Sequence, residues 1–427
     1  MAKKTDLKNT TVCSFCGRQM PHMLAGMGNN FICNECAEDA NLIFAQMGIL
    51  PITQNTDTSQ QTSAAPNSEP LQLSNLPHPR QIKEFLDQYV IGQEDAKRYL
   101  SVAVYNHYKR ILQPNDNDGV EIEKSNIVLV GPTGTGKTLL ARTIAKFLKV
   151  PFAIVDATVL TQAGYVGEDV ESLLSRLLQE CHGDVKKAEK GIVFIDELDK
   201  ISRKSDNPSI TRDVSGEGVQ QALLKLLEGS VVNVPPEGGR KHPEQEFLHV
   251  NTQNILFICG GAFEGIERKI AQRLNTQVVG FDSVLNRKSV DKNNLLQYIS
   301  PQDLKAYGLI PEIVGRLPIL THLNPLSKSA LRSILTEPKN AIIKQYKKLL
   351  EMDGVKLDFE ESVLDYIVDK AMEYKLGARG LRALAEVVMM DIMYQLPDDD
   401  NLTYTVTLDY AKKRIEAADM LKMQNSL

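Results

Sequence analysis

The stretch GPTGTGKT has the residue types and the spacing of a loop that binds nucleotide phosphates. Its glycines let backbone N–H groups converge on phosphate oxygens at the start of a helix. The lysine would reach the β and γ phosphates, and the threonine after it would ligate Mg²⁺. The motif therefore predicts a site for ATP and Mg²⁺. The residues that form it are Gly131, Pro132, Thr133, Gly134, Thr135, Gly136, Lys137 and Thr138.

Two carboxylates, Asp196 and Glu197, stand at the end of the apolar run GIVFID and directly after it. If that run is a strand of an open parallel sheet, both lie at the carboxyl edge, where ligands bind. Asp196 would then support the Mg²⁺, and Glu197 would orient and polarise the attacking water. The alternative is a pair of solvated acids that cap the next helix. Glu197 favours hydrolysis of the nucleotide over a switch that only binds it.

Four cysteines form two Cys-x2-Cys pairs near the beginning of the sequence, with 16 residues between the pairs. Each pair can supply two corners of a tetrahedron, so the pattern predicts one structural Zn²⁺ held by four thiolates. A segment of about 45 residues buries too little surface to fold alone, and the metal would stabilise it by about 10 kcal/mol. Two disulfides or a redox pair are the alternatives. The predicted ligands are Cys13, Cys16, Cys33 and Cys36.

The scaffold for these groups is indicated by short apolar runs that alternate with amphipathic helices from residue 126 onward. Continuous apolar strands separated by such helices indicate an α/β fold, a parallel sheet with helices on both faces. The phosphate loop falls between the first strand and the first helix, as the motif requires. The predicted strands are 126–130, 151–156, 191–196 and 254–260, and the helices are 137–150, 168–181 and 217–229.

The length of 427 residues indicates two or three domains, at about 150 residues per domain. Residues 1–50 would form the zinc-binding domain. Residues 51–75 are polar, nearly uncharged and without aromatic residues, which predicts a flexible linker. Residues 76–325 would form the large α/β ATPase domain, and residues 326–427 a smaller, mainly helical domain.

The composition bounds the class of protein. A net charge of -5 argues against a nucleic-acid coat, which is normally basic. The sequence contains no run of 18 apolar residues, so no membrane span is expected. The opening MAKKTDLKNT has no apolar stretch behind its lysines, and a cytoplasmic protein is therefore predicted. Six cysteines are too few for a disulfide scaffold, and Cys181 and Cys259 are interpreted as buried, unreactive thiols.

Several motifs together resemble one known family. GPTGTGKT followed by IVFIDE, then PEIVGRLP and GARGLR, resemble the AAA+ P-loop ATPases. With the four-cysteine module and GYVG at residues 164–167, nearly the whole chain is similar to the Clp-type unfoldases of that family. The combination is far more specific than any one motif.

The resemblance implies further nucleotide contacts. Arg316 in PEIVGRLP matches the arginine finger that acts on a neighbouring subunit's γ-phosphate, and Arg379 in GARGLR matches the sensor-2 arginine. By spacing alone, either arginine could lie on the surface without a role. Val90 and Ile91 resemble the segment that packs on adenine, although an apolar turn before a helix would look the same.

The resemblance also implies a ring, because an arginine finger supplied from a neighbour needs a closed assembly. The family forms homo-hexamers, a number that nothing in composition or periodicity reveals. Tyr165 and Val166 would line the pore and grip an extended chain, or the tyrosine could fold back on its own subunit. Arg240, Lys241 and His242, at the tip of a predicted hairpin, match a pore-entrance loop that attracts protein tails, although such a cluster is usually a solvated tip.

The last implied loop concerns a partner. Val279, Gly280 and Phe281 match the Ile-Gly-Phe loop that docks on a ClpP-type peptidase, with Val for Ile, a change of at most about 1 kcal/mol per contact. A further departure is that the strand at 254–260 runs into glycine, so no sensor-1 residue is assigned.

The leading hypothesis is an ATP-dependent unfoldase and translocase that binds tagged proteins and adaptors and feeds the peptidase. One alternative is a ring ATPase that moves nucleic acid, with the zinc module as a nucleic-acid ribbon; few basic residues near the cysteines argue against it. The other is a zinc-based adaptor with a silent ATPase domain, against which the intact Lys137, Glu197 and Arg316 argue.

Overall fold

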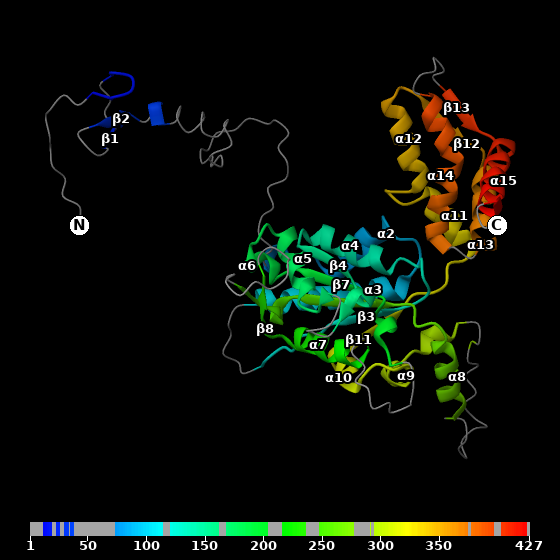
Figure 1. The fold of residues 1–427 in the computed structure, drawn as a ribbon, viewed down its shortest axis with the longest axis horizontal. Helices are drawn as coiled ribbons and strands as arrows, with labels where there is room; N and C mark the ends of the chain where they lie inside the picture. Colours follow the sequence, from blue (N-terminus) through cyan, green and yellow to red (C-terminus); the bar gives the residue numbers. More distant parts are fainter. Residues whose placement is uncertain are drawn as a thin grey trace. The chain divides into compact units, whose positions relative to one another are not determined.

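The computed structural model describes thirteen segments of the chain and divides it into two compact units, Met1–Asn67 and Ser68–Leu427 (Figure 1). The described residues are 12–18, 23–25, 30–33, 35–37, 73–113, 120–161, 168–203, 216–235, 247–276, 291, 294–374, 377–396 and 403–424.

The first unit is built around a small hairpin. Strands β1 (Met23–Ala25) and β2 (Phe31–Cys33) pair in antiparallel fashion. A tight turn precedes them, in which the Gly17 N–H donates to the Cys13 carbonyl at 2.9 Å, and Gly17 has a φ of 71° that glycine adopts at little cost. One helical turn at residues 35–37 follows β2. The two cysteine pairs thus lie on two short turns beside one hairpin.

The second unit contains a five-stranded parallel sheet in the order β11-β3-β10-β7-β4. All residues of β3 and β10 are buried, because helices cover both faces and leave no polar side to either strand. The predicted α/β fold with its parallel sheet is therefore confirmed. The strands are β3 (Ile127–Val130), β4 (Phe152–Asp156), β7 (Ile192–Asp196), β10 (Leu256–Gly261) and β11 (Ile319–His322).

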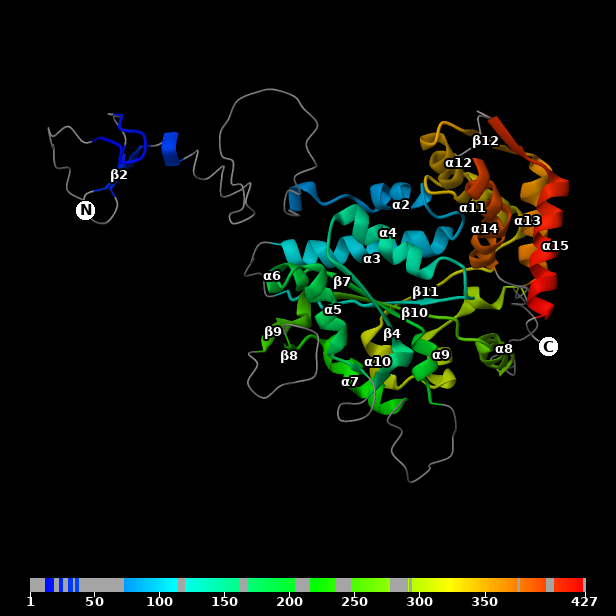
Figure 2. The same cartoon turned by 45° about the horizontal axis from the view of Figure 1, so that its top comes forward.

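The helices form a layer on each face of the sheet. In Figure 2, α2, α3 and α4 lie on one side and α5, α7 and α10 on the other. Alternate side chains of the strands point to opposite layers: Leu129 and Phe194 pack in the first core, and Val130 and Ile195 in the second. The helices of this part of the chain are α2 (Pro79–Asp87), α3 (Glu94–Leu112), α4 (Lys137–Leu148), α5 (Ser172–Glu180), α6 (Val185–Ala188), α7 (Glu217–Glu228), α8 (Ile266–Thr276), α9 (Pro301–Tyr307) and α10 (Pro311–Arg316).

Two expectations about the elements need correction. Four strands of the sheet were predicted, and β11 was not; its four residues include two polar ones, and only two residues separate it from α10. The helix expected over 168–181 begins only at Ser172, because Glu168–Asp169 pairs as strand β6 with β5 (Leu160–Thr161). In both cases a partner strand far along the chain or across a loop decided the local structure.

The hairpin predicted around the polar stretch after residue 234 is confirmed in its strands. β8 (Val231–Val234) and β9 (Leu248–Asn251) pair in antiparallel fashion. Short 3-10 turns connect other elements of the unit: η1 (Leu73–Asn75), η2 (Ala157–Val159), η3 (Leu198–Ile201), η4 (Thr252–Asn254) and η5 (Leu295–Tyr298).

The chain after residue 326 forms a mainly helical group with its own core, which includes Leu331, Ile367, Leu381 and Val388. The stretch expected to be helical after Leu326 is divided into two helices, because Pro338 cannot continue the first. The elements are α11 (Lys328–Thr336), α12 (Ile342–Met352), β12 (Lys356–Phe359), α13 (Glu361–Glu373), α14 (Gly377–Gln395), β13 (Thr403–Val406) and α15 (Leu408–Gln424).

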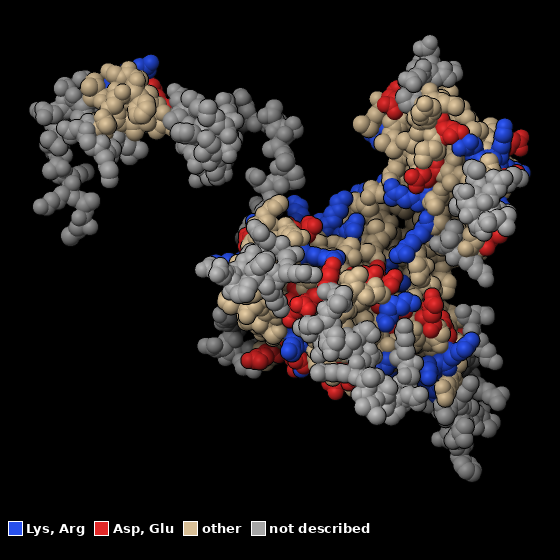
Figure 3. Space-filling model, in the orientation of Figure 1, with Lys and Arg blue, Asp and Glu red and all other residues tan. Residues whose placement is uncertain are grey.

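The surface of the second unit carries both signs of charge. On the face shown in Figure 3, Lys and Arg side chains are interspersed with Asp and Glu side chains. Among the described residues, none of the helices combines the length and the hydropathy needed to cross a membrane.

Candidate nucleotide site and zinc centre

The phosphate loop lies between β3 and α4, as its sequence predicts. Gly134 and Gly136 have φ values of 80° and 103°, in the left-handed region that favours glycine. Gly136 directly precedes α4, and its carbonyl accepts the Leu140 N–H at 2.9 Å. The first turn of a helix leaves its N–H groups without partners inside the helix, so this end of α4 suits phosphate oxygens.

The Lys137 ammonium group is held against the loop itself. Its Nζ donates to the Gly131 carbonyl at 2.6 Å and to the Pro132 carbonyl at 3.0 Å, and the residue is buried. Burial lowers the pKa of Lys137, while the negative charges of Asp196 and Asp199 raise it. The lysine is therefore a cation confined inside the loop that would surround the phosphates.

The beginning of α14 lies beside this loop. A Cβ added to Gly377 would lie 3.4 Å from the Thr133 carbonyl oxygen. Two residues further on, the positive charge of Arg379 acts to lower the pKa of Lys137, so the two cations are close enough to interact. The structure thus brings together the predicted phosphate loop and the predicted sensor-2 arginine, which lie more than 200 residues apart in the chain.

The predicted metal-supporting groups meet at the carboxyl edge of the sheet. The Thr138 hydroxyl donates to Asp196 Oδ2 at 3.0 Å, and the Glu197 N–H donates to Asp196 Oδ1 at 3.0 Å. A hydroxyl and a carboxylate are oxygen ligands of the kind that Mg²⁺ prefers, so the pair fits that ion. Glu197 is exposed and has a φ of 56°, a left-handed conformation that strains a residue with a side chain.

Asp199 is a further carboxylate of the site that sequence reasoning missed. It is buried, its Oδ1 accepts the Ala262 N–H at 3.0 Å, and its Oδ2 lies 3.6 Å from Lys200 Nζ. Its charge acts on Lys137. It therefore links the turn after β7 to the residue that follows β10. The signal in the sequence was a third acid three positions after Asp196.

The end of β10 has no room for a side chain. A Cβ at Gly260 would lie 2.6 Å from Phe194 Cζ, and a Cβ at Gly261 would lie 2.8 Å from Asp199 Oδ1. These glycines explain physically why a polar sensor-1 side chain cannot occupy this end of the strand.

The predicted adenine segment lies against the phosphate loop. Val90 is buried, and its Cγ1 lies 3.9 Å from the position of a Cβ added to Gly136. Ile91, beside it, is half-buried. An apolar surface thus borders the loop where a flat base could pack.

Arg316 lies at the amino end of strand β3, opposite the carboxyl end where the phosphate loop begins. Its carbonyl accepts Asn126 Nδ2 at 2.9 Å, and its guanidinium pairs with Glu228 Oε1 at 3.0 Å. Asn126 precedes β3 and Gly131 follows it, so about 16 Å of strand separates the two ends. The structure does not bring Arg316 to the phosphate loop of its own chain.

Three sets of predicted residues lie outside the described residues. They are Tyr165 and Val166, between β5 and β6; Arg240, Lys241 and His242, between β8 and β9; and Val279, Gly280 and Phe281, after α8. Their roles stay predictions.

The four predicted zinc ligands are gathered in one place. The sulfur atoms of Cys13, Cys16, Cys33 and Cys36 all lie within 4.8 Å of one another. Cys16 Sγ and Cys33 Sγ are 3.7 Å apart, too far for a disulfide and close to the edge of about 3.8 Å expected for a tetrahedron with Zn–S bonds of about 2.3 Å. The four sulfurs therefore fit Zn²⁺.

The thiols of this cluster differ in acidity. A hydrogen bond from the backbone of Cys16 lowers the pKa of Cys13 to about 6, whereas side-chain hydrogen bonds with Cys16 and Cys33 raise the pKa of Cys36 to about 12. The charge of one thiolate opposes the ionisation of its neighbour. A divalent cation offsets that repulsion, which is a second reason why the cluster suits a metal.

The remaining cysteines are buried as predicted. Burial raises the pKa of Cys181 to about 11 and that of Cys259 to about 12. Neither thiol ionises at neutral pH, which accords with the interpretation that both are unreactive.

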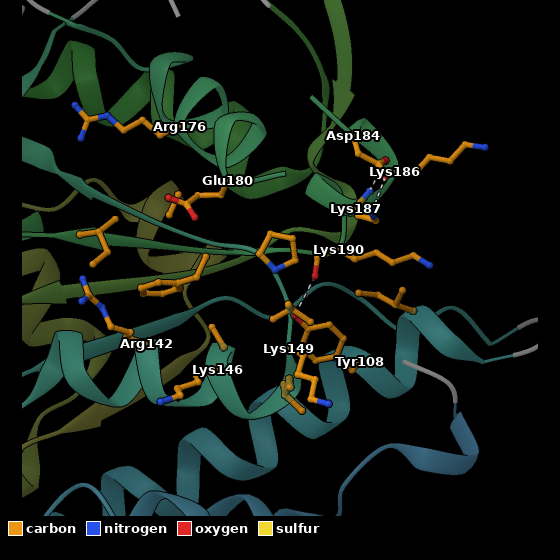
Figure 4. Close-up of a pocket in the computed structure, with 18 of the residues that line it drawn as sticks. Tyr108, Arg142, Lys146, Lys149, Arg176, Glu180, Asp184, Lys186, Lys187 and Lys190 are labelled. Atoms are coloured by element: carbon orange, nitrogen blue, oxygen red, sulfur yellow. Dashed lines mark hydrogen bonds and ion pairs between the residues drawn. The ribbon is translucent and has the colours of Figure 1, made fainter. Parts of the chain in front are cut away.

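A basic groove of about 1340 Å³ lies elsewhere, along the first residues of the edge strand β4 (Figure 4). None of the predicted site residues that the structure describes lines it. Arg142 and Lys146 of α4 and Lys149 directly after it lie on one side, and Lys187 and Lys190 lie on the other. Lysines beside an unpaired strand edge oppose pairing with a strand of another chain. This role explains the basic residues of the groove, and no ligand is needed to explain them.

Gly131→Ala should destabilise the second unit, because its Cβ would lie 2.7 Å from the Leu323 carbonyl oxygen, in a rigid part of the sheet. We expect a loss of about 1–3 kcal/mol, measured as a lower urea midpoint by circular dichroism. The matched control is Gly315→Ala, where an added Cβ meets nothing within 4 Å. Equal midpoints for the two variants would contradict the close contact.

Comparison with known proteins gives three matches to family models. Residues 122–320 match the AAA domain (Cdc48 subfamily), and residues 326–407 match the C-terminal, D2-small domain of ClpB protein. Residues 11–46 match the ClpX C4-type zinc finger. These matches follow the three predicted parts in order and include the phosphate loop, Arg379 and the four cysteines.

Whole-chain relatives are also similar. A protein of Bacteroides thetaiotaomicron is 64% identical over 422 residues, which cover 98% of this chain and 99% of the relative. A protein of Porphyromonas gingivalis is 61% identical over 427 residues, which cover 99% of this chain and 100% of the relative. Both carry the name "ATP-dependent Clp protease ATP-binding subunit ClpX". With identity this high over nearly the full length, the chain belongs to the ClpX family.

Proposed function

We propose that the chain is an ATP-driven protein unfoldase and translocase that delivers tagged proteins to a ClpP-type peptidase and has no peptidase activity of its own. The observation that carries the proposal is the convergence of Lys137, Thr138, Asp196 and Glu197 at one sheet edge, beside Arg379. The relatives named ClpX support the peptidase partner. The comparisons do not support the alternative of a nucleic-acid translocase, and on the face shown in Figure 3 Asp and Glu side chains lie among the Lys and Arg side chains of the described residues.

In the proposed reaction, Val90 and Ile91 bind the base, and the loop from Gly131 to Thr138 binds the phosphates. ATP brings the phosphoryl group that is transferred, and Mg²⁺ would be held by Thr138 and Asp196 and would neutralise phosphate charge. Glu197 orients a water for attack and accepts its proton. Arg379 senses the phosphates from the small domain.

Arg316 supports a ring in this proposal. Its backbone is hydrogen-bonded to Asn126 at the start of β3, and its own phosphate loop begins at the other end of that strand, about 16 Å away. Arg316 would therefore contact the γ-phosphate bound by a neighbouring subunit. We propose a closed homo-hexamer, as is typical of the resembled family. Tyr165 and Val166 would contact the translocated chain, Arg240, Lys241 and His242 would attract protein tails, and Val279, Gly280 and Phe281 would dock on the peptidase.

The domain bounds are proposed as 1–50 for the zinc domain, 51–75 for the linker, 76–325 for the large ATPase domain and 326–427 for the small one. We also propose that the protein works in the cytoplasm.

The test is degradation of a tagged, stably folded protein by the full-length chain with ATP and a ClpP-type peptidase. Degradation that needs both ATP and the chain is the expected result. ATP hydrolysis stimulated by DNA and not by unfolded protein would overturn the proposal.

Tyr165→Ala should slow degradation of the folded substrate about tenfold or more, while ATP hydrolysis stays within about twofold. The reason is that the substitution removes apolar contact between the pore loop and the substrate chain but leaves the nucleotide site intact. Both rates are measured in one reaction. Tyr394→Phe, on an exposed tyrosine of α14, is the control, and a pore variant that degrades as fast as this control would refute the pore role.

A further inference from the structure

Gln93 makes a reciprocal pair of hydrogen bonds with a residue 231 positions away. Its Nε2 donates to the Asn324 carbonyl at 2.8 Å, and its Oε1 accepts the Asn324 N–H at 2.8 Å. Gln93 is only 8% exposed. The side-chain amide thus satisfies both backbone groups of Asn324, as a neighbouring strand would.

The backbone of Gln93 has a strained conformation where the side chain makes these two hydrogen bonds. It precedes α3 with φ 59° and ψ 40°, the left-handed region, where a side chain costs about 1–2 kcal/mol relative to the ordinary helical region. Glycine would avoid that cost. Two half-buried hydrogen bonds, each of about 0.5–1.5 kcal/mol, offset it, and strained residues of this kind concentrate at functional sites.

On one side, Gln93 follows the proposed adenine segment. Val90, three residues before it, lies against the phosphate loop at Gly136. On the other side, Asn324 follows Leu323, whose N–H donates to the Val130 carbonyl at 2.8 Å and whose carbonyl oxygen would lie 2.7 Å from a Cβ at Gly131. Gln93 therefore joins two segments that both border the phosphate loop.

Asn324 also stands at the start of the connection to the helical group. Leu326, two residues later, packs against the core of that group, and Ser327 caps the N-terminus of α11. Asn324 therefore lies where the chain passes from the sheet to the helical group. A third hydrogen bond, from Asn294 Nδ2 to Asn324 Oδ1 at 2.8 Å, holds the side chain of Asn324 rather than its backbone.

We propose that Gln93 is a positioning residue that fixes the hinge at Asn324 to the adenine segment, so that the bound nucleotide sets the angle of the small domain. The inference rests on the proposed ATPase function and adds to it the residue through which the base and the hinge are connected. Gln93 need not touch the nucleotide; it acts through the backbone of Asn324.

The test uses the full-length chain with one reporter of domain angle. Because the sequence contains no tryptophan, Tyr394→Trp on the exposed end of α14 creates a single emitter. That position is 15 residues, or about 22 Å of helix, from Arg379 at the phosphate loop. Energy transfer from the tryptophan to methylanthraniloyl-labelled ADP, or to a labelled ATP analogue that resists hydrolysis, reports the angle for each nucleotide.

We expect the transfer efficiency in Tyr394→Trp to differ between the two nucleotides, and Gln93→Gly in that background to reduce the difference at least threefold. Glycine also removes the left-handed strain, so this variant should fold. The affinity for labelled ADP should change less than threefold, and kcat for ATP should fall about tenfold with KM within threefold. A role in folding alone would lower the midpoint of unfolding and leave the transfer difference intact.

Two controls make the result specific. Lys149→Gly relieves the same strain at φ 55° without touching the hinge, and Asn294→Ala removes the other bond to Asn324. Both should keep the transfer difference. An undiminished difference in Gln93→Gly, or none in the parent, overturns the inference while leaving nucleotide binding established. Failure of the parent to bind labelled ADP would instead refute the proposed function.

Discussion

Glu197→Gln is expected to lower kcat for ATP hydrolysis by about 10²–10⁴-fold while the affinity for ATP changes less than threefold. Glutamine has nearly the same shape as glutamate but cannot accept the proton of the attacking water. The backbone contact that places the residue, from the Glu197 N–H to Asp196 Oδ1, remains available to glutamine. Binding through Lys137 and Thr138 does not involve the changed atoms.

The measurement is steady-state phosphate release together with equilibrium binding of labelled ATP to the same preparation. Glu351→Gln is the matched control, since Glu351 is an exposed acid of α12 paired only with Lys348 among the described contacts. This control should hydrolyse ATP at the parent rate. Turnover by Glu197→Gln within tenfold of the parent would assign the base to another group, and Asp199 would be the next candidate because its charge also acts on Lys137.

Cys16→Ser is expected to reduce bound zinc from one ion per chain to less than about 0.2 and to unfold the first unit. Its sulfur lies 3.7 Å from Cys33 Sγ inside the four-thiol cluster. With so small a hairpin around the cluster, metal binding of about 10 kcal/mol supplies most of the stability of the unit. A zinc-selective chelator in excess Mg²⁺ should have the same effect on the full-length chain.

Zinc is measured by atomic emission, and the fold of the first unit by protection of its amide hydrogens. Basal ATP hydrolysis should stay within twofold, because the phosphate site lies wholly in the second unit. Cys181→Ser, on a buried thiol of that unit, is the control and should retain one zinc. A first unit that stays protected without metal would show that its hairpin folds by itself.

Elements with strong local patterns were predictable from the sequence. Strand β3, the phosphate loop and α4 follow from an apolar run, a glycine-rich motif and helical periodicity within about 25 residues. The zinc ligands were predictable in the same way, because the spacing of each Cys-x2-Cys pair lets its two thiolates occupy two corners of a tetrahedron. Strand β11 was not predicted, because two of its four residues are polar and the segment has no strand-like hydrophobic pattern of its own. Its pairing with β3 makes it a strand.

The sequence by itself thus determined the chemistry: the residues that would hold phosphate, Mg²⁺ and Zn²⁺, and the α/β scaffold, because these depend on residue types and short spacings. Only the tertiary structure decided which distant residues meet. It placed Arg379 beside Lys137, Arg316 at the opposite sheet edge, Asp199 against Ala262, and Gln93 on Asn324, 231 residues away. Such contacts depend on the path of the whole chain, and no local pattern encodes a hydrogen bond from a side chain to a distant backbone group.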